Sequence, residues 1–192
     1  MGDTAPGITI NQPGSSHPGL ADTPTGFQRR WFMGTWSVVW STLPMWKLTA
    51  DVNIKYTTLS EGDYNKFESD VSYRPRKGGS VSRVVGVERL SPSTNGATFD
   101  WRGNGWLVFV TSHWEVLGYG VQVVDGVEVE WAVTSFSKTL FTPAGLDLYL
   151  RPRSDAPASA EVRKAVIERV VPHIREVAGD VGRLGGQGFE VP

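Results

Sequence analysis

Two residues of the chain, His113 and Glu115, have the types and the spacing that acid–base chemistry requires. In an extended strand, residues two positions apart lie on the same face, where a carboxylate can orient an imidazole for proton transfer. Trp114 lies between them and takes the opposite face, so the pair faces solvent if Trp114 faces the interior. A solvated surface pair is therefore the alternative to a catalytic one. Tyr149, in a later alternating run, is the third candidate catalytic residue.

Other kinds of site are missing from the sequence. The chain has no cysteine, and its three histidines, His17, His113 and His173, lie in separate segments, so we expect no metal site. A Gly-x-Ser-x-Gly elbow, a phosphate-binding loop and a dinucleotide fingerprint are absent as well. We therefore expect no cofactor.

Charge and hydropathy limit the partners that the chain can have. It contains 19 Lys and Arg against 20 Asp and Glu, so no strong field attracts a nucleic acid. No stretch is long and apolar enough to insert into a membrane, and the first residues lack the pattern of a secretory signal. We therefore expect a cytoplasmic protein whose partner is a small molecule, and the sequence leaves its oligomeric state open.

The elements that must position these residues are short strands. With 8 Trp, 8 Phe, 5 Tyr, 22 Gly and 12 Pro, the composition is typical of a β-rich domain. Short runs of alternating apolar and polar residues are separated by turn residues such as Asp125-Gly126, a pattern that indicates an antiparallel sheet. The expected strands are Thr35–Ser41, Ala50–Leu59, Lys66–Tyr73, Val81–Leu90, Ala97–Trp101 together with Trp106–Val110, His113–Tyr119, Val129–Phe136 and Leu146–Arg151.

This pattern predicts an all-β fold, an eight-stranded antiparallel up-and-down barrel with one C-terminal helix packed outside. Closing the sheet into a barrel removes its exposed edges. Ser159 can cap the helix, Pro172 should kink or divide it, and the glycine-rich end of the chain should be solvated. Residues 1–25 are rich in Pro, Gly, Ser and Thr and are expected to form a flexible arm, unless Ile8 and Ile10 dock against the barrel. Residues 26–192 would then form the barrel domain.

Three motifs resemble the signatures of the lipocalin-like (calycin) β-barrel family. Phe32-Met33-Gly34-Thr35-Trp36 resembles the segment that opens the first lipocalin strand, and Leu148-Tyr149-Leu150-Arg151 before a proline and a helix resembles the third signature. The segments 114–119 and 130–133 resemble the strands around the second. The resemblance implies that Gly34, Trp36 and Arg151 are structural residues that close one end of the barrel, with the arginine covering the tryptophan ring.

Counting by twos from Trp36 predicts which side chains face the barrel interior. An eight-stranded barrel can enclose one small ligand, and the predicted lining suits a flat, conjugated apolar guest. The alternative is that these side chains fill the interior and leave no cavity. The expected ligand-binding residues are Trp40, Val52, Ile54, Tyr56, Trp114, Val116, Trp131 and Val133.

Two main functions fit these expectations. The first is hydrophobic ligand binding inside the barrel, by a carrier or a sequestering protein. The second is a cofactor-free enzyme of specialised biosynthesis, a cyclase or isomerase and possibly pericyclic, that holds an apolar substrate in a reactive conformation. A protein-interaction barrel with a filled interior is the third. The absence of an acid–base motif does not exclude the enzyme, because a positioned substrate needs little acid–base assistance.

Overall fold

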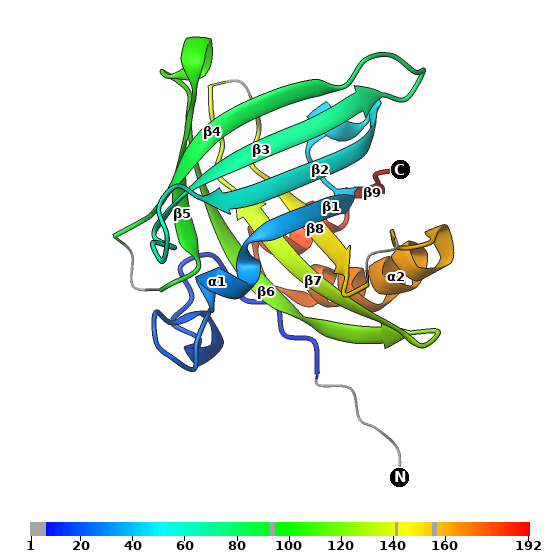
Figure 1. The fold of residues 1–192 in the computed structure, drawn as a ribbon. Coiled ribbons are helices and arrows are strands. Elements are labelled where there is room, and N and C mark those ends of the chain that lie inside the picture. Colours follow the sequence, from blue (N-terminus) through cyan, green and yellow to red (C-terminus); the bar gives the residue numbers. More distant parts are fainter. Residues whose placement is uncertain (1–6, 93–94, 141, 155–156) are drawn as a thin grey trace.

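The computed structural model describes residues 7–92, 95–140, 142–154 and 157–192. Within them, eight antiparallel strands close into an up-and-down barrel, because each strand pairs with the next and β1 pairs with both β2 and β8 (Figure 1). The predicted fold class is confirmed. The barrel strands are β1 (Gly34–Ser41), β2 (Thr49–Thr58), β3 (Lys66–Pro75), β4 (Ser82–Leu90), β5 (Thr98–Gly103), β6 (Thr111–Val124), β7 (Val127–Phe136) and β8 (Gly145–Pro152).

The connections between strands follow the turn residues in the sequence. Asp125 and Gly126 join β6 to β7 with φ of 50° and 78°. Positive φ at both central residues is what a two-residue type I′ hairpin turn requires. The prediction of a strand over residues 106–110 is wrong. There the chain leaves the ladder as the 3-10 helix η3 (Gly105–Leu107), and the backbone NH of Gly103 closes the loop on the carbonyl of Val110.

Short helices lie at both ends of the barrel, and a longer one lies on its outside. The helix α2 (Ala160–Glu176) begins at Ser159, whose hydroxyl accepts a hydrogen bond from the backbone NH of Val162. Pro172 lies inside α2 and does not divide it. The other helices are η1 (Pro18–Leu20), α1 (Arg29–Phe32), η2 (Pro44–Trp46) and α3 (Asp180–Gly185).

The apolar face of α2 covers one side of the barrel. Val162, Val166, Val170 and Ile174 are buried in a cluster that includes outward-facing side chains of β1, β6, β7 and β8. The barrel therefore has two cores, one inside it and one between its wall and the helix. On this side, both faces of the sheet are buried.

The C-terminal end of the chain also packs on the barrel, so the prediction of a solvated tail is wrong. A short strand, β9 (Phe189–Glu190), pairs with β1, and the backbone NH of Val191 donates to the carbonyl of Val39. Gly188 lies against the ring of Trp40, because a Cβ at this position would be 1.8 Å from Cζ2 of Trp40. The glycine is thus required for packing rather than for flexibility.

This contact leads to a stability prediction. Gly188→Ala should lower the free energy of unfolding by about 1–3 kcal/mol, the usual cost of forcing an extra carbon into a packed site. Chemical denaturation of the purified protein measures the change. Gly186→Ala is the matched control, because a Cβ there meets nothing closer than 3.5 Å. Equal stability of the two variants would contradict the docked position of the tail.

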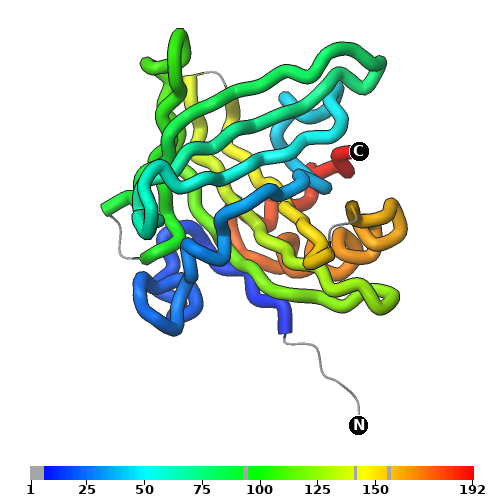
Figure 2. Tube along the Cα trace, viewed as in Figure 1, coloured from blue at the N-terminus to red at the C-terminus, as the bar shows by residue number. Residues whose placement is uncertain are grey.

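The first part of the segment 7–25 lies along the barrel wall beside β6, and the rest forms a loop at the end of the barrel near α1 (Figure 2). Ile8 and Ile10 pack against the outer core, and the backbone NH of Asn11 donates to the carbonyl of Leu117 on β6. The docking of Ile8 and Ile10 is therefore observed, whereas residues 1–6 lie outside the described residues. The division of the chain into a flexible arm and a barrel domain stays a prediction.

Candidate functional site

One end of the barrel is closed by Trp36 and Arg151. The guanidinium carbon of Arg151 lies 4.1 Å from the centre of the Trp36 ring, and the arginine donates to the carbonyls of Trp31 and Met33 at 2.5 Å each. Gly34 has a φ of +105°, and a Cβ on it would be 3.2 Å from Nη1 of Arg151. The guanidinium group of Arg151 therefore covers the Trp36 ring and holds the backbone of the segment before β1.

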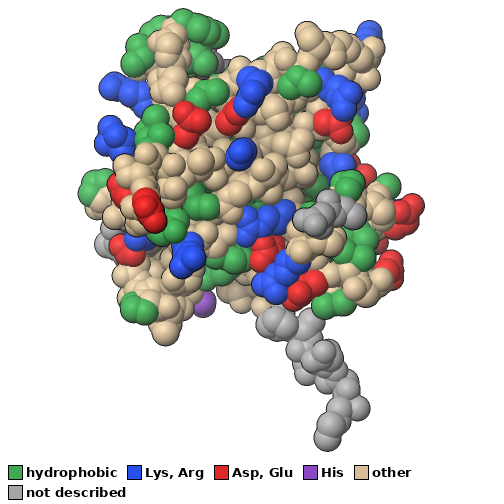
Figure 3. Space-filling view, in the orientation of Figure 1, with side chains coloured by type: hydrophobic (Ala, Val, Ile, Leu, Met, Phe, Trp, Pro, Cys, Tyr) green, Lys and Arg blue, Asp and Glu red, His purple; other side chains and the backbone are tan. Residues whose placement is uncertain are grey.

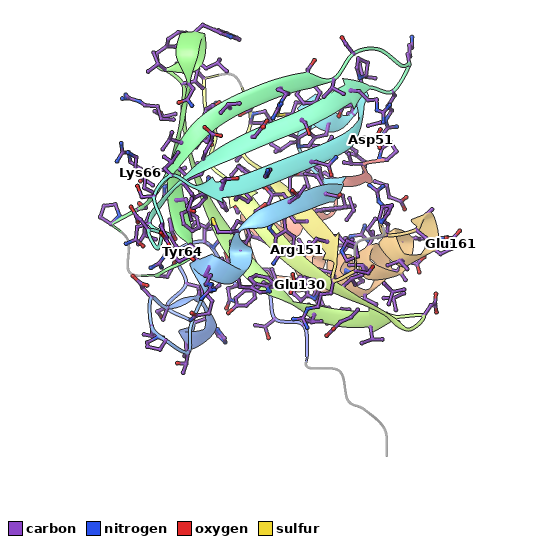
Figure 4. The ribbon with its side chains drawn as sticks, in the orientation of Figure 1. Asp51, Tyr64, Lys66, Glu130, Arg151 and Glu161 are labelled. Atoms are coloured by element: carbon purple, nitrogen blue, oxygen red, sulfur yellow. The ribbon has the colours of Figure 1, made fainter. Side chains whose placement is uncertain are left out.

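Glu130 holds this arginine in place. Its carboxylate pairs with Arg151 and accepts hydrogen bonds from Trp31 and Arg153, and Figure 4 shows Glu130 and Arg151 together near α1. Burial alone would raise the pKa of Glu130, but these donors bring it below its usual value. The closed end is an ionic and aromatic plug.

Phe32 fills the middle of the barrel above this plug. Its ring lies 5.4 Å from that of Trp36, 4.9 Å from that of Tyr56 and 5.9 Å from that of Trp114, measured between ring centres. The closed half of the barrel is thus solid, as the filled-interior alternative requires. The other half is not.

A cavity of about 620 Å³ occupies the half of the barrel away from α1. Its wall is mainly aromatic and aliphatic, and its volume lies within the usual range of small-molecule sites. Near the mouth, the β5–β6 connection carries Trp106, Val108 and Phe109, all largely exposed, and Figure 3 shows the hydrophobic side chains gathered there. The lining includes Leu43, Trp46, Ile54, Tyr56, Val71, Tyr73, Val84, Glu88, Trp101, Phe109, Trp114, Phe136, Asp147 and Tyr149.

Glu88, on β4, is one of two carboxyl groups in this apolar wall. Only 3% of it is exposed, and it accepts hydrogen bonds from Nε1 of Trp114 at 2.8 Å and from the hydroxyl of Ser69. Burial raises the pKa of Glu88 to about 7, although the two hydrogen bonds act in the opposite direction. The group can therefore gain or lose a proton near neutral pH.

Asp147, on β8, is the second carboxyl group. It is 1% exposed, and its oxygens accept hydrogen bonds from the hydroxyl of Ser41 at 2.5 Å and from Nε1 of Trp46 at 3.4 Å. Burial raises the pKa of Asp147 to about 7 as well. Strands from different parts of the barrel thus bring two titratable acids to one cavity.

Two tyrosine hydroxyl groups interact electrostatically with these acids. The hydroxyl oxygens of Tyr56 and Tyr149 are 3.5 Å apart, and each hydroxyl is close enough to interact electrostatically with both Glu88 and Asp147. Burial, followed by these negative neighbours, raises the pKa of both phenols, so they remain protonated donors. The two acids themselves belong to opposite walls, because β4 and β8 are four strands apart around the barrel in either direction, and neither acid is among the groups that shift the pKa of the other.

The structure places the sequence-predicted site residues in three groups. Ile54, Tyr56, Trp114 and Tyr149 line the cavity. The interior core contains Val52 and Val116, outside the cavity lining. The outer core, under α2, contains Trp40, Trp131 and Val133.

The prediction that Trp40, Trp131 and Val133 face the interior is therefore wrong. In β1, a bulge between Val38 and Trp40 shifts the alternation that started at Trp36. In β7, both faces are buried, so alternating hydrophobicity does not distinguish inside from outside. Trp131 instead packs over Gly120, where a Cβ would be 3.1 Å from its ring.

His113 and Glu115 lie on the outer face of the barrel. Nδ1 of His113 is 2.7 Å from the carboxylate of Asp100, and Nε2 is 3.5 Å from that of Glu115. Glu115 also accepts a hydrogen bond from the backbone NH of Gly14 at 2.7 Å. Because Trp114 faces the cavity, the pair is separated from it by the barrel wall, and Glu115 instead binds the backbone of the N-terminal segment.

Sequence reasoning missed Glu88 and gave Asp147 no inward-facing role, although a signal for Asp147 was available. Counting by twos from Arg151, which covers Trp36, places Tyr149 and Asp147 on the interior face. Glu88 has no such signal. It shares a face with Val84 and Leu90, while Val85 and Val87 share the other face with Arg83 and Arg89, so each face has two large apolar residues and the pattern does not show which face is inside.

Comparisons with known proteins add little to this geometry. No model of a known protein family and no curated protein matches the sequence. Sixty-two chains of solved structures match it. One is the siderocalin Ex-FABP, described as functioning through dual ligand specificities; it is 14% identical, with a TM-score of 0.41 over 71% of this chain and 84% of its own. Within the described residues, no helix has the length and apolar character needed to cross a membrane.

Proposed function

We propose that this lipocalin-like barrel binds one small, mainly apolar molecule in its cavity, as a carrier or sequestering protein. The observation that carries the proposal is the cavity of about 620 Å³ between the ring of Phe32, in the middle of the barrel, and the open end. Transfer of an apolar body from water to this wall is favourable at about 25 cal/mol per Å² of buried surface. Shape and burial are enough for this function.

The aromatic side chains suggest the shape of the guest. The rings of Trp114 and Phe136 are stacked, with an angle of 26° between their planes, and Trp46 and Tyr73 meet edge to face at another part of the wall. Flat, conjugated molecules gain from such surfaces beyond the area that they bury. Trp106 and Phe109, exposed beside the mouth, provide an apolar surface that a ligand can contact on entry.

A cavity-blocking variant tests the proposal. Native mass spectrometry of the protein, purified from the cells in which it naturally occurs, should show one equivalent of an apolar molecule that denaturation releases. Val84→Trp should lose that molecule, because Val84 lines the cavity and an indole would occupy its space. Val123→Trp is the matched control, because Val123 is 61% exposed, lies near the β6–β7 turn and is not part of the cavity lining. An equal load on both variants would contradict binding in the barrel.

The same cavity also suits a cyclase or isomerase, which is the second candidate. The observation that favours it is the presence of Glu88 and Asp147, two buried acids with pKa values of about 7 that could move a proton on a held substrate. The molecule released from the native protein distinguishes the two functions. The released molecule is incubated again with fresh protein. A carrier leaves it chemically unchanged, whereas an enzyme converts it, unless the released molecule is already the product.

A further inference from the structure

Glu88 and Asp147 lack a cationic partner within the protein. They are 3% and 1% exposed, and the ion pairs of the described residues do not include either of them. None of the described residues that line the cavity is Lys, Arg or His. A buried carboxylate without a positive partner is unfavourable, because burial removes water without replacing it by an opposite charge. The missing charge has to come from outside the chain or the acids have to stay protonated.

The walls around these acids also favour a cation. Indole NH groups of Trp114 and Trp46 donate to the carboxyl groups, so the edges of these rings are directed at the acids. The faces of aromatic rings carry negative potential and attract positive groups within about 6 Å. Ser69, Tyr56 and Tyr149 add hydroxyl oxygens to the same cavity. An ammonium group has three N–H donors, and at either acid the carboxylate oxygens and neighbouring hydroxyl oxygens can accept them.

We propose that the ligand of this barrel is a hydrophobic amine, bound as its cation, with the ammonium group at one of the two acids, Glu88 or Asp147, and the aromatic or alicyclic body against the apolar wall. This inference rests on the proposed function, because it names the class of molecule that the cavity holds. The protein supplies two negative charges and the ligand supplies the positive charge that the cavity lacks.

The other ligand classes fit the cavity less well. A carboxylate ligand would add a third negative charge to a cavity that already holds Glu88 and Asp147. A neutral alcohol or ketone would bury its apolar body equally well but would leave both acids without a counter-charge. The pKa values of about 7 agree with this comparison, because they show how unfavourable the unpaired carboxylates are.

Three matched probes test the inference. Naphthylethylamine, naphthylethanol and naphthylacetic acid share one aromatic body and differ in charge. Isothermal titration of the ligand-stripped protein at about pH 8, where the amine is protonated and the acids are ionised, should give the tightest binding for the amine. We expect the amine to bind at least about tenfold more tightly than the alcohol, and the acid to bind most weakly.

The variants Glu88→Gln and Asp147→Asn show whether the carboxyl groups cause the preference. Each amide keeps an oxygen that can accept the indole hydrogen bond, so the cavity should keep its shape. The variant at the acid that holds the ammonium group should lose most of the preference for the amine, while the affinity of both variants for the alcohol stays the same, which also shows that they are folded. Glu61→Gln, in the exposed turn between β2 and β3, is the control and should bind all three probes as the parent protein does.

The outcomes separate this inference from the proposed function. Equal binding of the amine and the alcohol, or an amine preference that survives when Glu88→Gln and Asp147→Asn are combined in one protein, overturns the amine inference and leaves small-molecule binding supported. Binding of none of the three probes by the folded protein contradicts the proposed function and the inference together. Loss of the preference in one of the two single variants, with the alcohol still bound, supports both the inference and the proposed function.

Discussion

Trp36→Ala should lower the free energy of unfolding by about 3–5 kcal/mol, the range observed when a buried aromatic side chain is removed from a core. Trp36 is completely buried, and its Nε1 donates to the carbonyl of Phe32 at 2.8 Å. The variant also uncovers the guanidinium group of Arg151, whose carbon lies 4.1 Å from the Trp36 ring centre. Chemical denaturation, followed by far-UV circular dichroism, measures the change.

Trp106→Ala is the matched control for this prediction. Trp106 is 80% exposed beside the mouth, so its removal leaves no cavity and should change the stability by less than about 0.5 kcal/mol. The two variants should also differ in binding, because Trp36 is outside the cavity wall whereas Trp106 is part of it. Similar stability losses in both would contradict the placement of Trp36 as the plug of the closed end.

The barrel was predictable from sequence because one face of several strands is buried and the other is solvated. In β2, Val52, Ile54 and Tyr56 are buried, while Asp51 and Lys55 are exposed. Such alternation indicates both a strand and its inward face. The short turns then make neighbours in sequence into neighbours in the sheet, and closure follows from the number of strands.

The inward faces of β7 and β8 were not predictable in the same way. The helix α2 covers the outside of these strands, so Trp131 and Leu148 are buried there as completely as Ala132 and Tyr149 are inside. Hydrophobicity carries no information on direction when both faces are dry. In β8, the inward-facing residues can be assigned only from one residue of known orientation. Arg151 is such a residue, because the motif pairs it with Trp36.

The polar part of the candidate site could be predicted only to a small extent. An acid inside an apolar barrel contradicts the rule that the charged positions of a strand face water, so Glu88 looks like a surface residue in the sequence. The indole of Trp114 that satisfies it comes from β6, more than 20 residues away along the chain. Contacts of this kind are formed by the closed barrel and leave no local pattern.

Raising the pH should destabilise the ligand-free protein through Glu88 and Asp147. Burial raises the pKa of Glu88 from 4.5 to about 7 and that of Asp147 from 3.8 to about 7. Because each folded-state pKa lies above the unfolded-state value, the folded state binds the proton more tightly. The stability that results is fully present below the unfolded-state pKa and is lost as the pH rises through about 7.

The variant Glu88→Gln isolates this effect. It should be more stable than the parent protein at about pH 8 by about 3 kcal/mol, since each pKa unit corresponds to about 1.4 kcal/mol, and the two should be nearly equal at about pH 4. Urea denaturation over this pH range gives the difference, and Glu61→Gln, in an exposed turn, should show none. A difference between Glu88→Gln and the parent that does not change with pH would show that ionisation of Glu88 is not its cause.

A bound amine should reverse this pH dependence. When an ammonium group pairs with Glu88 or Asp147, it stabilises the ionised form of that acid, so its pKa should fall and binding should release protons. The parent protein titrated with naphthylethylamine should then keep its stability up to about pH 8, whereas naphthylethanol should raise the stability equally at every pH. Ionisation of an unpaired buried acid lowers the free energy of unfolding of the empty barrel, and a cationic ligand that pairs with the acid restores it. The pH dependence of unfolding, with and without the ligand, measures both effects.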